Sequence, residues 1–154
     1  MTKWLIVSVI LLFNLIGCSK DSVERDKPPN LTIQIGNKTY KTKLGSYCWN
    51  TKSKGICVDT AGPVDLLKGE KPIQVKAAEI VTIKMDYRPK PSEVHVTQVN
   101  GNKEIQVDVK KNQQFKAPTG KGIYYYAYGV WWEFKNDDHI SNGDVFYAFA
   151  LEVK

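Results

Sequence analysis

The sequence predicts an all-β domain built as a two-sheet sandwich with Greek-key connections. Short runs in which apolar and polar residues alternate recur about every ten residues, as strands do in such domains. Clusters of Gly, Pro, Asn and Lys separate these runs and are typical of turns. No amphipathic helical pattern lies between them, so roughly eight to ten short strands are expected to form two packed sheets.

The strand candidates follow one another from residue 31 to the end of the chain. Residues 31–35 and 39–44 flank Gly36-Asn37, which is typical of a hairpin turn, and Asn100-Gly101 provides a second turn of this kind. Residues 63–67 permit one short helical turn. The remaining expected strands are 46–49, 56–58, 73–75, 80–85, 94–99, 105–109, 123–134 and 145–153.

The N-terminal segment has the pattern of an export signal. Lys3 precedes an apolar stretch over residues 4–16, which is shorter than the roughly 20 residues that span a bilayer as a helix. The stretch ends in Leu15-Ile16-Gly17-Cys18, which resembles the lipobox of bacterial lipoproteins. The resemblance implies cleavage before Cys18, a diacylglyceryl group on its thiol and an acylated amino terminus, with palmitate among the acyl chains. A membrane-spanning anchor and an ordinary signal peptide with a chance cysteine are the alternatives.

This pattern predicts three parts of the chain. Residues 1–17 are expected to be a lipoprotein signal peptide, 18–30 a lipidated cysteine with a flexible tether, and 31–154 the sandwich domain. Two or more acyl chains hold a protein firmly at a membrane. The polar tether of Ser19 to Asn30 spans about 20 Å. We therefore expect a protein attached to the extracytoplasmic face of the cell membrane through Cys18, with its domain close above the lipid.

The charge balance limits the classes of partner. The formal net charge is +6, from 22 Lys and Arg against 16 Asp and Glu, and the basic balance belongs to the exported part. Nucleic acid is not an expected partner outside the cell, whereas anionic headgroups and cell-wall polymers are. The lysines are spread from Lys20 to Lys154, which favours a generally basic surface over a dedicated polyanion site. The sequence indicates no oligomeric state.

Three segments carry a second resemblance. They are residues 73–85, residues 117–126 with Ala-Pro-Thr-Gly-Lys-Gly-Ile-Tyr-Tyr-Tyr, and residues 143–149 with Gly-Asp-Val-Phe-Tyr-Ala-Phe. They resemble an uncharacterised immunoglobulin-like domain of lipoproteins from Bacillus and related Firmicutes, over about residues 30–154. The resemblance implies an immunoglobulin-like sandwich and an exported location, and it implies no particular chemistry.

Cys48 and Cys57 are expected to form a structural disulfide. An oxidising compartment and an even count of cysteines in the exported part favour pairing. Their spacing does not fit a Cys-x-x-Cys redox pair or a zinc cluster. Closing this loop would stabilise the fold by about 2.5–3 kcal/mol in the chain-entropy model. The loop that the bridge pins carries Trp49 and could form a rigid recognition surface.

The aromatic residues of the last two strands are candidates for binding. In a regular strand Tyr124, Tyr128 and Trp132 share one face and Trp131 the other, unless a bulge at Gly129 exchanges them. One face fills the core, so one ring of the Trp131-Trp132 pair is expected outside, available to sugars, peptide side chains or a protein partner. Coverage of the outer rings by residues 50–62 or by lysine stems is the alternative. The candidate binding surface is Trp49, Tyr124, Tyr128, Trp131 and Trp132.

Two further patterns suggest small ligands. Tyr124-x-x-x-Tyr128 is similar to the Tyr-x-x-x-Tyr of haem-binding NEAT domains, and this resemblance implies ligation by tyrosinate. The loop over residues 135–144 contains Asp137, Asp138 and Asp144, whose oxygens suit calcium. Its spacing departs from an EF-hand, and turn geometry accounts equally well for its Asp and Asn residues. A ligand or ion carrier serving a transporter is therefore the alternative function.

No sequence motif supports an enzyme. A nucleophile elbow, a Walker loop, a dinucleotide fingerprint and His-Glu-x-x-His are absent from the sequence. His95 lies within an expected strand, where a structural or solvated role is favoured over a catalytic base. No cysteine follows Cys57, which excludes a cupredoxin copper site. We expect a non-catalytic binding or envelope-interaction module without a cofactor, with an envelope protein or cell-wall polymer as its partner.

Overall fold

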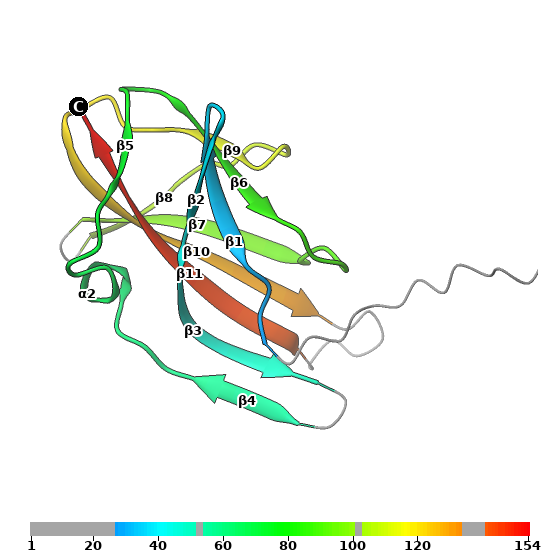
Figure 1. The fold of residues 1–154 in the computed structure, drawn as a ribbon. Coiled ribbons are helices and arrows are strands. Elements are labelled where there is room, and N and C mark those ends of the chain that lie inside the picture. Colours follow the sequence, from blue (N-terminus) through cyan, green and yellow to red (C-terminus); the bar gives the residue numbers. More distant parts are fainter. Residues whose placement is uncertain (1–26, 52–53, 101–102, 134–140) are drawn as a thin grey trace, which may run out of the picture.

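The structure is a computed structural model that describes residues 27–51, 54–100, 103–133 and 141–154. Within this part of the chain it contains eleven strands and one short helix, arranged as two sheets packed face to face (Figure 1). The expected all-β sandwich is thereby confirmed. The expected leader, Cys18 and most of the expected tether lie outside the described residues.

The smaller sheet is antiparallel throughout and begins with the expected hairpin. Leu31, Ile33 and Ile35 alternate inward as buried residues. Gly36 occupies the hairpin turn with a positive φ of 52°, which glycine adopts at no steric cost. In spatial order the strands are β2 (Lys38–Lys41), β1 (Leu31–Ile35), β6 (Ile80–Met85) and β9 (Gln114–Lys116).

The larger sheet contains the two longest strands at its centre (Figure 1). β5 (Ile73–Val75) adds to it by parallel pairing with the last residues of β11. The other strands, in spatial order, are β4 (Gly55–Val58), β3 (Lys43–Asn50), β11 (Ser141–Val153), β10 (Gly122–Glu133), β7 (Glu93–Asn100) and β8 (Lys103–Gln106).

The core lies between the sheets and contains many aromatic rings. Tyr126 stacks on Phe149 with ring centroids 4.9 Å apart, and Phe115 of the smaller sheet contacts both rings. The buried hydroxyls are hydrogen-bonded: Tyr126 donates to the Gln98 side chain and Tyr147 donates to the carbonyl of Pro29. Among the described residues, no buried side-chain nitrogen or oxygen lacks a partner. Polar satisfaction of this kind is expected of a well-packed core.

Three further rings close one end of the sandwich. Trp49, Tyr87 and Trp132 meet edge to face, with centroid distances of 5.2 to 5.8 Å. The indole of Trp132 also donates to the carbonyl of Pro89 at 3.0 Å. Such T-shaped clusters are favoured by the ring quadrupoles. Trp49 of β3 and Trp132 of β10 therefore pack in the core, although both belong to the binding surface expected from the sequence.

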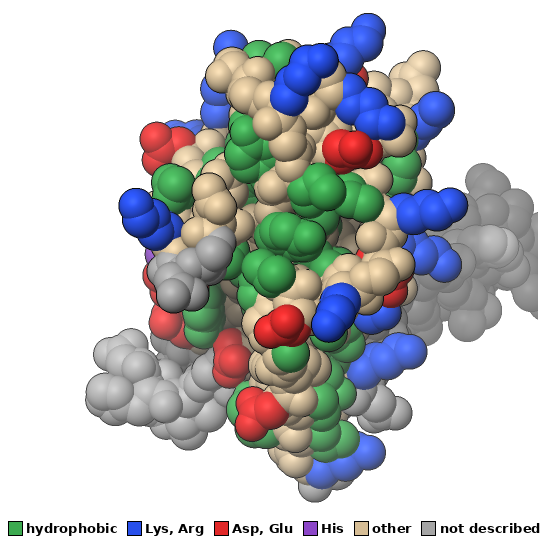
Figure 2. All heavy atoms as spheres, turned by 90° about the vertical axis from the view of Figure 1, so that its left-hand side faces the viewer, with side chains coloured by type: hydrophobic (Ala, Val, Ile, Leu, Met, Phe, Trp, Pro, Cys, Tyr) green, Lys and Arg blue, Asp and Glu red, His purple; other side chains and the backbone are tan. Residues whose placement is uncertain are grey.

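The outer face of the larger sheet is partly covered by the helix α2 (Pro63–Leu66). Leu66 and Leu67 pack on Ala148 and Ala150 of β11 together with Tyr125 and Phe146. Figure 2 views the molecule from the side of α2 and β5 and shows apolar side chains gathered along the middle of this face, with Lys and Arg mostly at its edges. In the described part of the chain, no helix has the length and apolar character needed to cross a membrane.

The element predictions differ from the structure at four places. The strand expected over 39–44 is divided between β2, which ends at Lys41, and β3, which begins at Lys43. The strand expected over 105–109 ends at Gln106, and β9 was not predicted. β9 has only three residues and one buried side chain, Phe115, which is too little for an alternating pattern. Pro28 and Pro29, expected in the tether, are buried, so the folded domain begins before residue 31. Residues 19–154 contain every described element.

Candidate functional site

The outer face of the larger sheet carries one continuous row of chemically distinctive side chains. Strand pairing places Glu93 opposite Trp131 and Trp131 opposite Asp144. Asp144 in turn pairs with Cys48, and Cys48 pairs with Cys57. Directly paired residues project to the same face, with their Cβ atoms about 5 Å apart. The row therefore crosses five strands at the same level of the sheet.

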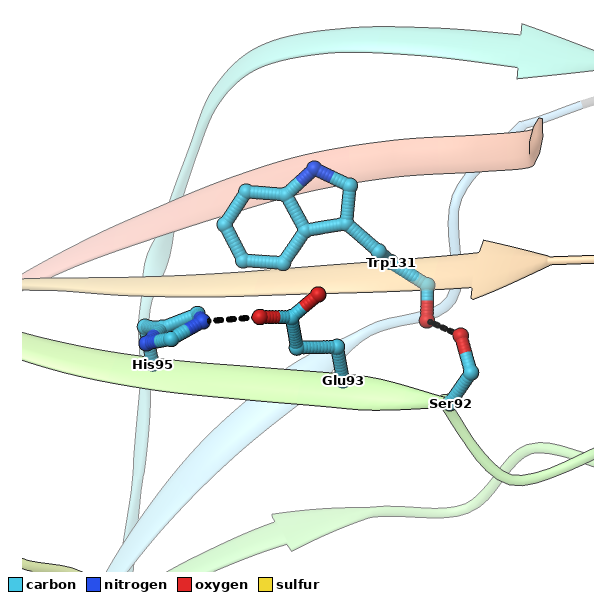
Figure 3. A network of polar contacts seen from close by, with 4 residues as sticks. All are labelled: Ser92, Glu93, His95 and Trp131. Atoms are coloured by element: carbon cyan, nitrogen blue, oxygen red, sulfur yellow. Dashed lines mark hydrogen bonds and ion pairs between the residues drawn. The ribbon is translucent and has the colours of Figure 1, made fainter. Parts of the chain in front are cut away.

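Trp131 forms a flat platform at the centre of this row. A Cβ added at Gly129 would lie 2.8 Å from Cη2 of Trp131, so the indole lies directly over the Gly129 backbone. Figure 3 shows the indole broadside against the strands, and the imidazole of His95 beside it edge-on. The two ring centroids are 5.4 Å apart at an interplanar angle of 81°. One indole face is thus on the sheet while the other faces outward, and Trp131 is 36% exposed.

Two polar side chains flank the platform on β7. His95 and Glu93 are two residues apart and share a face of the strand, so their side chains meet. Nε2 of His95 and Oε1 of Glu93 form a hydrogen bond of 2.5 Å, and both side chains are about half exposed (Figure 3). The pair is solvent-accessible, so it offers a carboxylate oxygen and an imidazole to a ligand that lies on the indole.

Ser92 fixes the position of the platform in the sheet. Its backbone N–H and its hydroxyl both donate to the carbonyl of Trp131, each at 2.9 Å (Figure 3). The same hydroxyl accepts a hydrogen bond from the backbone N–H of Glu133 at 3.1 Å. These bonds join the start of β7 to the end of β10. The Trp131 platform, defined here as Ser92, Glu93, His95 and Trp131, is therefore built on rigid strands.

A second ring is flattened against the same face. Phe146 lies over Gly45, where an added Cβ would come within 2.3 Å of the phenyl ring. Phe146 and Gly129 are paired residues, so the Phe146 and Trp131 side chains lie on neighbouring strands of the same face. Two glycines thus provide the space for two rings. The outer face is consequently apolar from the platform towards α2.

The disulfide of Cys48 and Cys57 ends the row, as predicted. It joins β3 to the edge strand β4 between directly paired residues whose Cα atoms are 4.1 Å apart. It therefore fixes the register of β4 in the sheet. The side chain of Trp49, expected on the loop surface, instead points into the core.

The candidate aromatic surface needs correction. Trp49, Tyr128 and Trp132 are buried, with 5%, 3% and 2% of their surface exposed, because they lie on inner faces of the larger sheet. Tyr124 is half-buried and its hydroxyl donates to the carbonyl of Gly120. The predicted division of Trp131 and Trp132 between the two faces is observed, and β10 pairs regularly through Gly129. Only Trp131 of the five residues is an exposed ring.

The tyrosine pair does not converge on one site. The hydroxyl of Tyr128 donates to Oε1 of Gln113, whereas that of Tyr124 donates to Gly120. Burial raises the pKa of Tyr128 to about 12, which disfavours the tyrosinate that haem ligation needs. The geometry therefore argues against the pair as a haem site.

Of the three candidate calcium ligands in the acidic loop, only Asp144 lies within the described residues. Asp137 and Asp138 lie outside the described residues, and Asp144 belongs to the row on β11. Among the residues that the structure describes, no group of three His, Cys, Asp or Glu side chains is arranged to hold a metal ion.

Sequence reasoning missed three contributors to the site. Glu93 and Ser92 were not considered, and His95 was interpreted without its neighbour. The i, i+2 spacing of Glu93 and His95 on a strand was the available signal. The spacing of Gly129 and Trp131 was a second signal, because a large ring two residues from a glycine can lie over it. Pairing of β7 with β10 was not predictable from either segment alone.

The Trp131 platform can bind a ligand by stacking and hydrogen bonding together. A flat indole attracts the apolar C–H face of a sugar ring, while Glu93 and His95 can contact hydroxyl or amide groups at its rim. No protein-family model matches the chain, and comparison with curated proteins gives no match.

Proposed function

We propose that the protein is a lipid-anchored lipoprotein of the extracytoplasmic membrane face whose sandwich binds an envelope glycan, without catalysis. The observation that carries the binding proposal is the Trp131 indole, which lies flat on the sheet over Gly129 with its outer face exposed. Exposed aromatic rings held rigidly beside polar groups are typical of binding surfaces.

The chemistry of the platform favours a glycan over a purely apolar partner. A sugar ring presents C–H bonds on its face and hydroxyls around its edge. The platform has the same arrangement in complementary form, with an indole at its centre and the Glu93–His95 pair at its rim. A glycan bound here could form hydrogen bonds with Glu93 and His95. A hydrocarbon would instead cover these polar groups without replacing their hydrogen bonds to water, which costs free energy.

The proposed anchorage rests on the sequence. Leu15-Ile16-Gly17-Cys18 is similar to a lipobox, and a disulfide in the domain accords with an oxidising compartment. Because Pro28 and Pro29 are buried, a flexible tether could extend only over residues 19–27, and a chain of this length would span about 15–18 Å. The domain would therefore sit near the membrane, within reach of the innermost glycan strands.

The geometry gives less support to catalysis and to the binding of haem or calcium. Glu93 and His95 lie on an open sheet face, where water is not excluded as catalysis usually requires. The alternative of a haem or calcium carrier depends on Tyr124 and Tyr128, whose hydroxyls bond to different segments, or on an acidic loop that lies largely outside the described residues.

Titration calorimetry of residues 19–154 with soluble cell-wall glycan fragments tests the binding proposal. Trp131→Ala should weaken the affinity about tenfold or more, since truncation of a central aromatic anchor typically costs this much. Ile123→Ala is the matched control, because Ile123 is an exposed apolar residue on the same face of β10. Equal affinity of both variants, or no binding to the wild-type chain, would refute the glycan assignment; capture of a protein instead would reassign the surface.

A further inference from the structure

A groove of about 430 Å³ lies between the two sheets, separate from the Trp131 platform. It exists because β9 pairs only with the first half of β6, which leaves residues Ile83 to Met85 of β6 without a neighbouring strand on that side. The connection before β7 and the connection before β9 border the opening. Ile83, Met85 and Val94 supply apolar walls.

Three lysines from three different segments border this groove. Lys84 comes from β6, Lys90 from the connection between β6 and β7, and Lys111 from the connection between β8 and β9. Within the described part of the chain, none of the three forms an ion pair and no carboxylate lines the groove. Lys84 alternates with the inward-facing Ile83 and Met85, so its side chain starts from the outer face of the smaller sheet, whereas Lys90 and Lys111 come from the connections at the opening. Three cations that border one opening without a counter-charge among the lining residues create a local positive potential that attracts an anion.

Amide and hydroxyl groups lie on the inner side of the same groove. The hydroxyl of the buried Tyr128 donates to Oε1 of Gln113 at 3.1 Å, which orients the Gln113 amide. No bond from the amide nitrogen of Gln113 is seen among the described residues, so its two N–H donors are available to a ligand oxygen.

The backbone at Gln113 is held in an uncommon conformation that places this side chain. Its φ is +61°, in the left-handed region that non-glycine residues seldom adopt. The tight turn is fixed by bonds from Gln113 N–H to the Lys110 carbonyl and from Ile83 N–H to the Gln113 carbonyl. Residues held in this way are concentrated at binding sites.

We propose that this groove binds a phosphate ester. Ammonium groups from three segments suit a tetrahedral anion that presents oxygens in several directions better than a planar carboxylate. The apolar walls suit the organic part of the ester. The phosphate could belong to a soluble ester or to an anionic lipid headgroup, and the two sources share the chemistry that the groove recognises.

The test uses residues 19–154 with two probes at about 0.15 M salt, where contacts between distant surface charges are screened. Glycerol 3-phosphate is titrated by calorimetry, and vesicles of phosphatidylglycerol are used in a sedimentation assay with phosphatidylcholine vesicles as reference. The triple variant Lys84→Gln, Lys90→Gln, Lys111→Gln should lose about tenfold or more in affinity for whichever probe binds.

The control removes the same charge elsewhere. Lys38→Gln, Lys68→Gln, Lys121→Gln changes three exposed lysines that do not line the groove and should leave binding within about twofold of the wild type. Gln113→Gly suits the positive φ and removes the amide without a charge change, so it should weaken binding by about threefold. Binding of glycerol 3-phosphate identifies the ester itself as sufficient, and binding of vesicles alone assigns the lipid headgroup. Equal loss in both triple variants, or no binding of either probe, would overturn the proposal.

Discussion

Gly129 determines whether the Trp131 platform exists. Its absent side chain leaves the space that the indole occupies, and a methyl group there would lie 2.8 Å from the ring. Gly129→Ala should therefore displace the indole and reduce glycan affinity about as much as Trp131→Ala, while the free energy of unfolding changes by less than about 1 kcal/mol because the ring can move outward. Calorimetric affinity and urea unfolding of one variant measure both. Unchanged glycan affinity in a folded Gly129→Ala protein would contradict the flat-ring geometry.

Gly143 has a different role, because its neighbours are buried. An added Cβ would lie 2.5 Å from the Trp49 ring and 3.1 Å from the Cys48 carbonyl. Gly143→Ala should destabilise the protein by about 1–3 kcal/mol through overpacking of the core. Gly62→Ala, where the space is open, should change the free energy of unfolding by less than about 1 kcal/mol. Urea unfolding of both variants decides; a Gly143→Ala protein as stable as the control would show that the aromatic cluster is loosely packed.

Buried tyrosines should make the fold sensitive to alkali. Burial raises the pKa of Tyr128 from 10.0 to about 12, and it raises the pKa values of Tyr126 and Tyr147 as well. A folded-state pKa above the unfolded value means that the stabilisation is complete below pH 10 and is lost as the pH rises through 12. Tyr128→Phe should therefore show a shallower loss of stability between about pH 10 and 12, by roughly 2–3 kcal/mol across the range.

Urea unfolding at several pH values compares this variant with the wild type. Tyr124→Phe is the control, since Tyr124 is only half-buried and its hydroxyl bonds to a loop carbonyl. Identical pH profiles for wild type and Tyr128→Phe would contradict the effect of burial on Tyr128.

For single residues, the sequence predicted opposite faces for Trp131 and Trp132, because side chains alternate between the two faces of a strand. It did not predict which face of β3 carries Trp49, since a four-residue run gives too short a pattern. The flattening of the Trp131 ring depends on the backbone beneath it, and the groove amide of Gln113 depends on a turn that neighbouring residues impose. These features are tertiary and have no periodic signal.

Among the elements, β4 depends most on the disulfide. It is a four-residue edge strand that pairs only with β3, and Cys57 ties it to Cys48. Cys48→Ser with Cys57→Ser should cost about 2–3 kcal/mol of unfolding free energy. The amides of β4 should lose hydrogen-exchange protection more than those of β10, because edge strands open locally. Uniform loss of protection across the larger sheet would contradict a local role for the bridge.

Element existence was predicted well wherever alternation was long. The β1–β2 hairpin and the strands β6, β7, β10 and β11 lie close to the predicted ranges. β9 was missed because three residues pair with β6 through a long-range contact that no local pattern encodes. Because β9 is so short, a groove opens beside β6. The second proposed site therefore depends on a strand that the sequence did not predict.

The whole molecule presents two chemically distinct surfaces on one sandwich. The Trp131 platform lies on the outer face of the larger sheet, and the lysine-bordered groove opens between the sheets. Positive charge is spread widely along the sequence, yet three lysines border one groove because the fold brings residues 84, 90 and 111 to the same opening. The sequence predicted a basic exported domain, and only the topology shows where charge gathers.

Nuclear magnetic resonance mapping of glycan binding tests the central claim most directly. With isotope-labelled residues 19–154, added cell-wall glycan fragments should shift the indole N–H signal of Trp131 and the signals of Glu93 and His95. The indole N–H of Trp132, which is buried and donates to Pro89, should stay in place and serves as an internal control. Shifts confined to other surfaces, or no shift at saturating glycan, would contradict the account.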